Sequence, residues 1–355
     1  MSGQTLLLTP DDPAWDGWLE RTAHDVYHRA AYHRLSEGAG EGRAYMVVHA
    51  ALGRFMVWPY LVRPAGESDH DAYSVYGYPG PLGQGLEDEE FVLRAWQAAR
   101  SVWSEQGLVT LFTRFHPLLA NDRFCVGLRG AAPVEGGEIL ALGRTVAMDL
   151  AHDRDGRRAG YPQPLRQEIK RSERAGLKVE EDPDWRFLPE FGVFYRQTMQ
   201  RNGAAGAYFF SDQYLDELRK ALQGYAYLAV AHVDGAVAGI MIFTVAGKIA
   251  QAHLTGTNPE YQHLSPLKVL IDRVADLAAA RGAAWLHLGA GRGGFEDSLF
   301  AFKSRFSSLR CEFRVGRWIL RDDRYRELAG ARSGGAAPDH KYFPAYRAPP
   351  GANDA

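Results

Sequence analysis

Residues 289–306 read GAGRGGFEDSLFAFKSRF, with four glycines in the first six positions and a short amphipathic segment after them. Leu299, Phe302 and Phe306 recur at helical spacing and give this segment one apolar face. The glycines satisfy the pattern G-x-G-x-x-G, yet no strand–helix–strand unit follows them, and Glu312 opens a strand instead of ending one. We therefore interpret the stretch as a glycine loop between a strand and a helix, whose backbone a substrate can approach closely.

The rest of the second half supplies the elements around this loop. Asp234-Gly235 predicts a hairpin between two apolar strands. Ser265–Arg281 predicts a long helix with Pro266 at its first position. We also expect strands over 146–150, 227–233, 236–245, 248–256, 284–288 and 313–320, a basic helix over 164–176, and further helices over 189–201, 212–222 and 298–305.

The first half repeats this order of helices, a strand pair, a long helix and a strand. The expected elements are helices within 16–35 and over 87–107, strands over 44–51, 54–62 and 108–115, and a rigid aromatic loop over 73–82. At about 150 residues per domain, 355 residues suit two domains. We expect an α+β protein with domains over 1–144 and 145–328, and a partly disordered C-terminal tail over 329–355.

The composition excludes several classes of function. The chain is 46% hydrophobic and 24% charged, and its formal net charge of −2 does not suit a histone-like or polybasic membrane-binding protein. We expect no DNA partner. No apolar run has the roughly 18 residues of a transmembrane helix, and the N-terminus lacks the features of a signal peptide. Together with only two cysteines, Cys125 and Cys311, this favours a cytoplasmic protein.

Motifs for metal or covalent catalysis are weak. His24 and His28 stand four residues apart, but Asp25 occupies the place where a metalloprotease has glutamate, and no third ligand is evident. The sequence contains no recognisable Ser-His-Asp order, G-x-S-x-G elbow or Walker motif. We therefore expect neither a metal nor a cofactor, and we expect direct transfer between bound substrates, which depends on positioning and charge stabilisation.

Four segments together resemble the FemAB/FemX-like branch of the GNAT acyltransferase superfamily. The glycine loop and DSLFAFKSRFS resemble the signature D-S-L-x-x-F-K-x-x-F of that branch. The other three are the aromatic loop DAYSVYGYPGPL (71–82), the basic helix RQEIKRSERAGLKV (166–179), in which Ser172 and Leu177 depart from the pattern, and the long helix and strand over 260–289. The resemblance implies two GNAT-like domains in tandem that face a shared cleft.

The resemblance also implies an enzyme. Fem-type transferases move an amino acid from aminoacyl-tRNA to an amine of a peptidoglycan precursor, and related proteins serve other acylations. By position, Lys303 would be the catalytic cation, with Phe302 as its aromatic neighbour near the acyl donor. The other residues that the resemblance assigns to substrate binding are Arg166, Lys170, Arg171, Tyr76, Tyr78, Gly291 and Arg292; the three on the basic helix would meet substrate phosphates.

Two departures keep alternatives open. The glycine-rich loop that binds pyrophosphate in GNAT enzymes is replaced by residues 261–266, YQHLSP, and Pro266 removes one amide donor. The lysine expected near the N-terminus of an enzyme that binds a cell-wall precursor has no match in 29–34. The alternatives are an acyl-CoA-dependent GNAT N-acyltransferase, which the missing loop disfavours, and a GNAT-like binding module without turnover.

Overall fold

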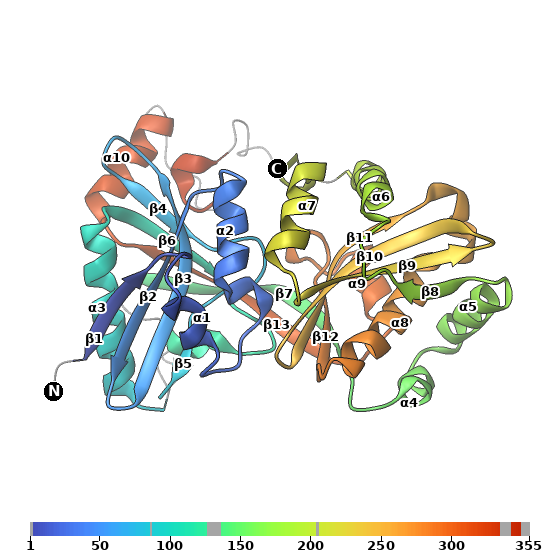
Figure 1. Ribbon diagram of the computed structural model, residues 1–355. Coiled ribbons are helices and arrows are strands. Elements are labelled where there is room, and N and C mark those ends of the chain that lie inside the picture. Colours follow the sequence, from blue (N-terminus) through green and yellow to red (C-terminus); the bar gives the residue numbers. More distant parts are fainter. Residues whose placement is uncertain (1–2, 86, 126–135, 204–205, 334–341, 349–355) are drawn as a thin grey trace. The chain divides into compact units, whose positions relative to one another are not determined.

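The computed structural model describes residues 3–85, 87–125, 136–203, 206–333 and 342–348 (Figure 1). The chain divides into two compact units. The first contains Met1–Ala23, Tyr27–Leu142 and Phe313–Ala355, and the second contains His24–Val26 and Gly143–Glu312. Each unit combines helices with a mixed sheet, which confirms the expected α+β class.

The sheet of the first unit contains one parallel pair of strands. Its strands are β1 (Gln4–Leu8), β2 (Arg43–Ala51), β3 (Arg54–Pro64), β4 (His70–Tyr73), β5 (Leu82–Gln84), β6 (Leu108–Arg114) and β13 (Arg310–Ile319). Their order is β1-β2-β3-β4-β6-β13, and β5 pairs with β3. β4 and β6 run parallel, whereas the other neighbours are antiparallel.

Helices cover both faces of this sheet. The helical elements of the first unit are α1 (Ala14–Leu19), α2 (Ala30–Gly38), α3 (Glu89–Glu105), η2 (Asn121–Phe124), α10 (Asp322–Ser333) and η6 (Ala345–Arg347), and η1 (Val26–His28) begins at its border. One core contains residues of α1 and α2, and the other contains residues of α3. Trp58 of β3 packs among the rings of Trp96, Trp103 and Trp318, with centroids 5.3–5.7 Å away.

The second unit has the corresponding topology. Its strands are β7 (Gly137–Asp149), β8 (Lys178–Glu181), β9 (Ala226–Val233), β10 (Ala236–Ala246), β11 (Ile249–Thr257) and β12 (Trp285–Gly289). Their order is β7-β12-β11-β10-β9-β8, and only β11 and β12 are parallel among these pairs. The predicted hairpin joins β9 and β10, where Asp234 and Gly235 both have positive φ, as a tight hairpin turn requires.

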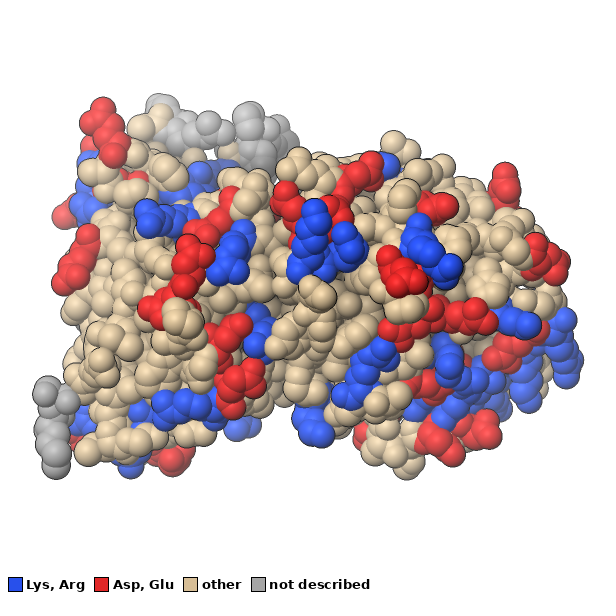
Figure 2. All heavy atoms as spheres, in the orientation of Figure 1, with Lys and Arg blue, Asp and Glu red and all other residues tan. Residues whose placement is uncertain are grey.

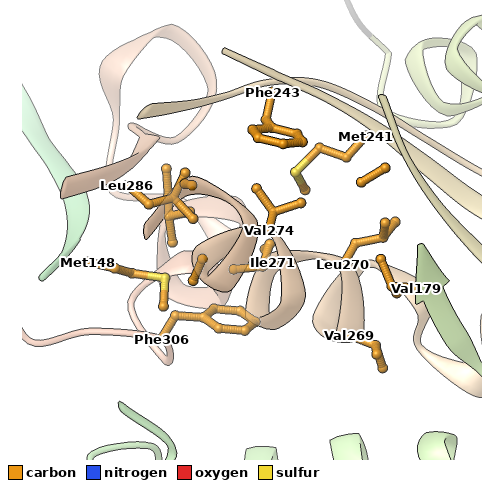
Figure 3. Packing of buried hydrophobic residues seen from close by; sticks show 14 of the residues in the cluster. Met148, Val179, Met241, Phe243, Val269, Leu270, Ile271, Val274, Leu286 and Phe306 are labelled. Atoms are coloured by element: carbon orange, nitrogen blue, oxygen red, sulfur yellow. The ribbon is translucent and has the colours of Figure 1, made fainter. Parts of the chain in front are cut away.

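A long helix supplies most of the core of this unit. The helical elements here are α4 (Arg154–Ala159), α5 (Gln163–Arg174), α6 (Leu188–Arg201), η3 (Gly206–Tyr208), α7 (Asp212–Ala221), η4 (Pro259–Leu264), α8 (Pro266–Ala280), η5 (Arg292–Gly294) and α9 (Ser298–Lys303). Leu270, Ile271 and Val274 of α8 pack with Phe243 and Leu286 of the sheet (Figure 3). The opposite face meets α6, because a Cβ on Gly256 would lie 2.7 Å from the backbone nitrogen of Tyr195.

The two parallel strands of the second unit separate soon after they meet. They pair only over Ile249–Gln251 and Trp285–His287. Beyond this point β11 has a bulge at His253, and the pairing of β12 with β7 shifts register before Gly289. The two strands thus part ahead of both Gly256 and Gly289.

Two strands, β7 and β13, each contain residues of both units. β7 follows β6 in sequence but pairs with β12, and β13 follows β12 but pairs with β6. One change of unit falls between Leu142 and Gly143, and the expected boundaries stay a prediction. Residues from Phe313 onward belong to the first unit instead of the second, because Trp318 is buried among its tryptophans.

The described part of the C-terminal tail is ordered against the first unit. α10 continues to Ser333, and Tyr325 stacks on Phe343 with ring centroids 6.3 Å apart. Arg347 forms an ion pair with the buried Asp71, to which Tyr346 also donates a hydrogen bond. Residues 329–333 and 342–348 of the expected tail are therefore ordered, and the expectation of partial disorder stays a prediction; residues 334–341 and 349–355 lie outside the described residues.

Candidate functional site

Lys303 lies against the glycine loop. It is the last residue of α9, and its Nζ donates a hydrogen bond of 2.7 Å to the backbone oxygen of Ala290. The side chain is half-buried. The ammonium is thus held at the end of β12, just beyond the point where β11 and β12 separate, and does not extend freely into solvent.

The surroundings of Lys303 change its acidity. Burial lowers the pKa of Lys303 to about 8, and the nearby charge of Asp297 opposes this shift. At pH 7 the group is mostly a cation, which can stabilise negative charge. A lysine with a pKa near the working pH is also able to exchange a proton during a reaction.

Asp297 organises the loop in front of α9. Its Oδ1 accepts hydrogen bonds of 3.0 Å from the backbone amides of Leu299 and Phe300 and so caps the helix. Hydrogen bonding from the Arg292 side chain is the largest effect that lowers the pKa of Asp297, to about 2. A Cβ on Gly291 would lie 2.2 Å from Oδ1 of Asp297, so only glycine leaves room for this contact.

Arg292 and Gly291 are therefore close to Lys303 through this shared carboxylate. The Arg292 guanidinium is bonded to Asp297 through Nε at 2.8 Å, and its Nη1 donates to the backbone oxygen of Asn202 at 3.2 Å. Its side chain is still 60% exposed. The neighbouring Phe295 is 70% exposed, so the loop presents a cation and an aromatic ring to solvent.

Phe302 lies in a different environment from its neighbour. Its ring packs against the core of the second unit and contacts Phe306 edge-on, with centroids 5.6 Å apart. This packing fixes α9 on the unit and thereby supports the position of Lys303. Contact of Phe302 with a substrate stays a prediction.

The basic helix α5 divides into an inward and an outward side. Arg166 donates to the backbone oxygens of Ala159 and Tyr161 at 3.1 and 3.0 Å, which ties α5 to the end of α4. Lys170 and Arg171 are exposed, and neither has an ion-pair partner among the residues that the structure describes. Figure 2 shows Lys and Arg side chains gathered where α5 forms the surface.

Tyr76 and Tyr78 belong to the first unit. They follow β4 in a loop where Gly77 has a φ of +115°, and a Cβ there would strike the ring of Tyr27. Tyr78 contacts Tyr27, His116 and Phe313 edge-on, with centroids 5.3–5.9 Å apart. Its ring is thus part of an aromatic cluster of that unit, and a role in substrate binding stays a prediction.

The start of α8 is occupied by the protein's own charges. Glu168 of α5 lies 3.1 Å from Nζ of Lys268 and 2.8 Å from the guanidinium of Arg305. Burial acts to raise the pKa of Glu168, but the hydrogen bonds and charges of these two cations together outweigh burial and lower the pKa. Pro266 lacks an amide hydrogen at the first helical position. An anion at this helix terminus would compete with Glu168.

Sequence reasoning missed a buried polar group beside the parting strands. Gln251 of β11 and His287 of β12 face one another, and Asp25 contacts Gln251. All three are at most 3% exposed. His253, at the bulge, is 8% exposed, and burial lowers its pKa to about 4 although Asp25 opposes the shift. The available signal was the set of polar residues in two otherwise apolar strands, IAQAHLTGT and WLHLG.

Two kinds of feature are absent from the described parts of the chain. Over these residues, His, Cys, Asp and Glu side chains do not form any group of three or more that is suited to a metal ion. His24, Asp25, His28 and His33 are all buried. Within the same residues, every helix is too short or too polar to cross a lipid bilayer.

Comparisons with known proteins agree with this architecture. Residues 161–303 match the family model of the acetyltransferase (GNAT) domain. The crystal structure of FemX has a TM-score of 0.69 at 12% identity, over 91% of this chain and 99% of that chain. The C-terminal domain of a protein assigned as lysylphosphatidylglycerol synthetase from Agrobacterium fabrum has a TM-score of 0.55 at 19% identity, over 91% and 96%. The search of curated proteins found no match.

The comparisons define the class of protein. The fold is similar to that of FemX, and residues 161–303 match the GNAT domain model, so the expected FemX-like, tandem GNAT-like arrangement is confirmed as a fold. The match to the acetyltransferase domain model indicates an acyltransferase. The donor, the acceptor and the role of each side chain are matters for a proposal.

Proposed function

We propose that this protein is a Fem-like transferase that moves an aminoacyl group from aminoacyl-tRNA to an amine, such as that of a peptidoglycan precursor, in the cytoplasm. The observation that carries the proposal is the position of Lys303. Its ammonium is hydrogen-bonded at 2.7 Å to the backbone oxygen of Ala290, on a glycine loop beyond the separating strands β11 and β12.

The reaction needs charge stabilisation more than a strong nucleophile. The acceptor nitrogen attacks the ester carbonyl and forms a C–N bond, and the carbonyl oxygen becomes an oxyanion. The C–O bond to the donor then breaks, the donor oxygen leaves as a hydroxyl group, and the nitrogen loses one proton. Lys303 is proposed to stabilise the oxyanion or the donor phosphate next to it, an effect of the order of 10²–10³ in rate.

Exposed cations on α5 suit the polyanionic substrates of this reaction. Lys170 and Arg171 are proposed to contact phosphates, whereas Arg166 acts through its bonds to two backbone oxygens. Arg292 and Gly291 are proposed to bind substrate at the loop, and Phe302 to support Lys303. Tyr76 and Tyr78 are proposed to contact the acceptor.

An acyl-CoA-dependent N-acyltransferase is the second candidate, favoured by the match to the acetyltransferase domain model. We rank it lower because Pro266 and the pairing of Glu168 with Lys268 leave the start of α8 poorly suited to a pyrophosphate. A binding module without turnover is the third.

Transfer assays with radiolabelled donors separate these candidates. Purified protein is incubated with aminoacyl-tRNA or with acetyl-CoA, together with amine acceptors that include a peptidoglycan precursor. We expect Lys303-dependent transfer from aminoacyl-tRNA. Lys248→Ala is the matched control, because Lys248 also donates to a backbone oxygen in this unit, that of Gly282, but at an exposed position. Lys303-dependent transfer from acetyl-CoA alone would reverse the ranking, and no transfer from either donor would favour the binding module.

A further inference from the structure

A series of buried side-chain hydrogen bonds links β11 and β12 at their last paired position. Gln251 and His287 are the final residues in register before the strands separate. The Gln251 amide donates from Nε2 to Oδ2 of Asp25 at 2.5 Å, and its Oε1 lies 2.8 Å from Nδ1 of His287. The backbone amide of Val26 donates to the other oxygen of Asp25 at 2.6 Å. A segment far away in the sequence thus fixes this strand pair.

Only one arrangement of hydrogens satisfies this chain. The amide group of Gln251 directs its NH2 toward Asp25, because Nε2 donates to Oδ2 of that carboxyl. The amide oxygen then faces His287 and accepts from it. Nδ1 of His287 must therefore carry the hydrogen of this bond.

The Asp25–Gln251–His287 hydrogen bonds lie just before the residue whose carbonyl binds Lys303. His287 precedes Gly289, whose φ is +79°, and Ala290, whose backbone oxygen binds Lys303. The register pairing of β11 with β12 ends at Gln251 and His287, and the side chains of these two residues contact one another at that end. The position of the Ala290 oxygen therefore depends on the direction of the β12 backbone after His287.

We propose that Asp25, Gln251 and His287 act as positioning residues that set the end of β12 and thereby hold the Ala290 carbonyl where it binds the ammonium of Lys303. The catalytic meaning of this inference rests on the proposed function. The positioning itself is a property of the free protein and is measurable without any substrate.

Two substitutions of His287 distinguish positioning from simple packing. His287→Asn retains a side-chain N–H near the place of Nδ1 and is the conservative variant, whereas His287→Phe retains a flat ring and loses the donor. The matched control is Ser172→Ala, since Ser172 is also buried in this unit and donates a 2.6 Å hydrogen bond to the backbone oxygen of Leu264. It removes one buried hydrogen bond far along the chain from β12.

The readout is the titration of Lys303 by NMR on protein labelled at lysine. The chain has seven lysines, so substitution of Lys303 assigns its signal directly. We expect a pKa of about 8 in the unaltered protein and in the Ser172→Ala and His287→Asn variants. In His287→Phe the pKa should rise by about one unit or more toward the ordinary lysine value. Nitrogen-15 shifts should show the Nδ1–H form of His287.

Two results would overturn the inference: an Nε2–H form of His287, or an unchanged Lys303 titration in folded His287→Phe protein. If His287→Phe does not fold, Gln251→Leu and Gln251→Glu provide the same comparison, because the first removes both side-chain bonds and the second places a carboxylate beside Asp25. Transfer rates are a separate measurement. A shifted Lys303 pKa without a matching shift in the alkaline limb of transfer supports the positioning and contradicts the proposed function.

Discussion

The two units use one topology but hold their parallel strands differently. In the first unit the buried Asp71 of β4 accepts a hydrogen bond of 2.9 Å from Thr110, its register partner on β6. Tyr346 and Arg347, near the C-terminus, also bind Asp71. In the second unit the corresponding pair is Gln251 and His287, and Asp25 binds it. Each parallel pair is thus held by a segment from far along the chain.

The helices that lead into the second parallel strand differ in charge. α3 begins with Asp88 as its cap, which accepts from the amide of Phe91 at 3.0 Å, followed by Glu89 and Glu90. These carboxylates suit the positive end of the helix and would repel a substrate anion there. α8 has no acidic residue in its first turn and no side-chain cap.

The difference between the starts of α3 and α8 suggests different roles for the two units. In the first unit, carboxylates occupy the start of α3. Its C-terminal segment binds the parallel strand pair. The second unit keeps a glycine loop and a half-buried lysine beyond its strand pair. Under the proposed function, the second unit acts on the activated donor, and the first unit supplies the acceptor contacts of Tyr76 and Tyr78.

The largest effect is expected at Lys303. Lys303→Ala should lower the transfer rate by roughly 10²-fold or more, about 2.7 kcal/mol, because it removes the cation beside the oxyanion. Lys303→Arg should restore little, since a planar guanidinium does not replace a compact ammonium. The measurement is turnover together with the melting temperature of the same preparation. Unaltered turnover in a folded Lys303→Ala protein would remove this residue from the site.

The next effect concerns stability and the first unit alone. Asp71→Asn should lower the free energy of unfolding by about 2 kcal/mol, because Arg347 loses its buried counter-charge. Denaturant titration measures the loss. The control is Asp11→Asn, whose ion pair with Arg34 is exposed and worth little. If Asp71→Asn instead altered the Lys303 titration as His287→Phe should, the division of roles between the units would be wrong.

Much of the fold follows from local patterns. The Asp234-Gly235 turn, the Pro266 helix start and the apolar spacing around Phe302 predicted elements that the structure contains. The exchange of β7 and β13 between the units has no local signal, because either strand suits either sheet edge by composition. Only the burial of Trp318 among tryptophans of the first unit decides where β13 pairs.

The site was predictable only in part. Lys303 follows a glycine loop that is visible in the sequence, and the structure holds it beside that loop. Asp25 is separated from Gln251 by more than half the chain, so no spacing relates them. A basic helix in sequence also does not reveal that Arg166 binds backbone oxygens while Lys170 and Arg171 remain exposed.

The pH dependence of transfer tests the state of Lys303. If its cation stabilises the oxyanion, activity is present while Lys303 is protonated and is lost as the pH rises through about 8. The alkaline limb of kcat/KM should therefore fall with an apparent pKa near 8. Lys303→Arg should move this limb beyond the measurable range, because arginine stays protonated. An alkaline limb that persists at the same pH in Lys303→Arg would assign it to another group.

The smallest effect is expected for the binding of acyl-CoA at the start of α8. α8 lacks the carboxylates of α3, but Glu168 from α5 neutralises Lys268 and Arg305 beside it. Calorimetry with acetyl-CoA should therefore show binding weaker than micromolar, and inorganic pyrophosphate should bind weakly as well.

Glu168→Gln leaves both cations without their counter-charge and should strengthen pyrophosphate binding a few-fold, since nearby cations favour an anion at a helix start. Glu173→Gln is the control, because Glu173 lies on the same helix but pairs with Arg158. Micromolar acetyl-CoA affinity in the unaltered protein would show that the start of α8 accepts a pyrophosphate despite Pro266 and Glu168, and the ranking of the two donors would then be reversed.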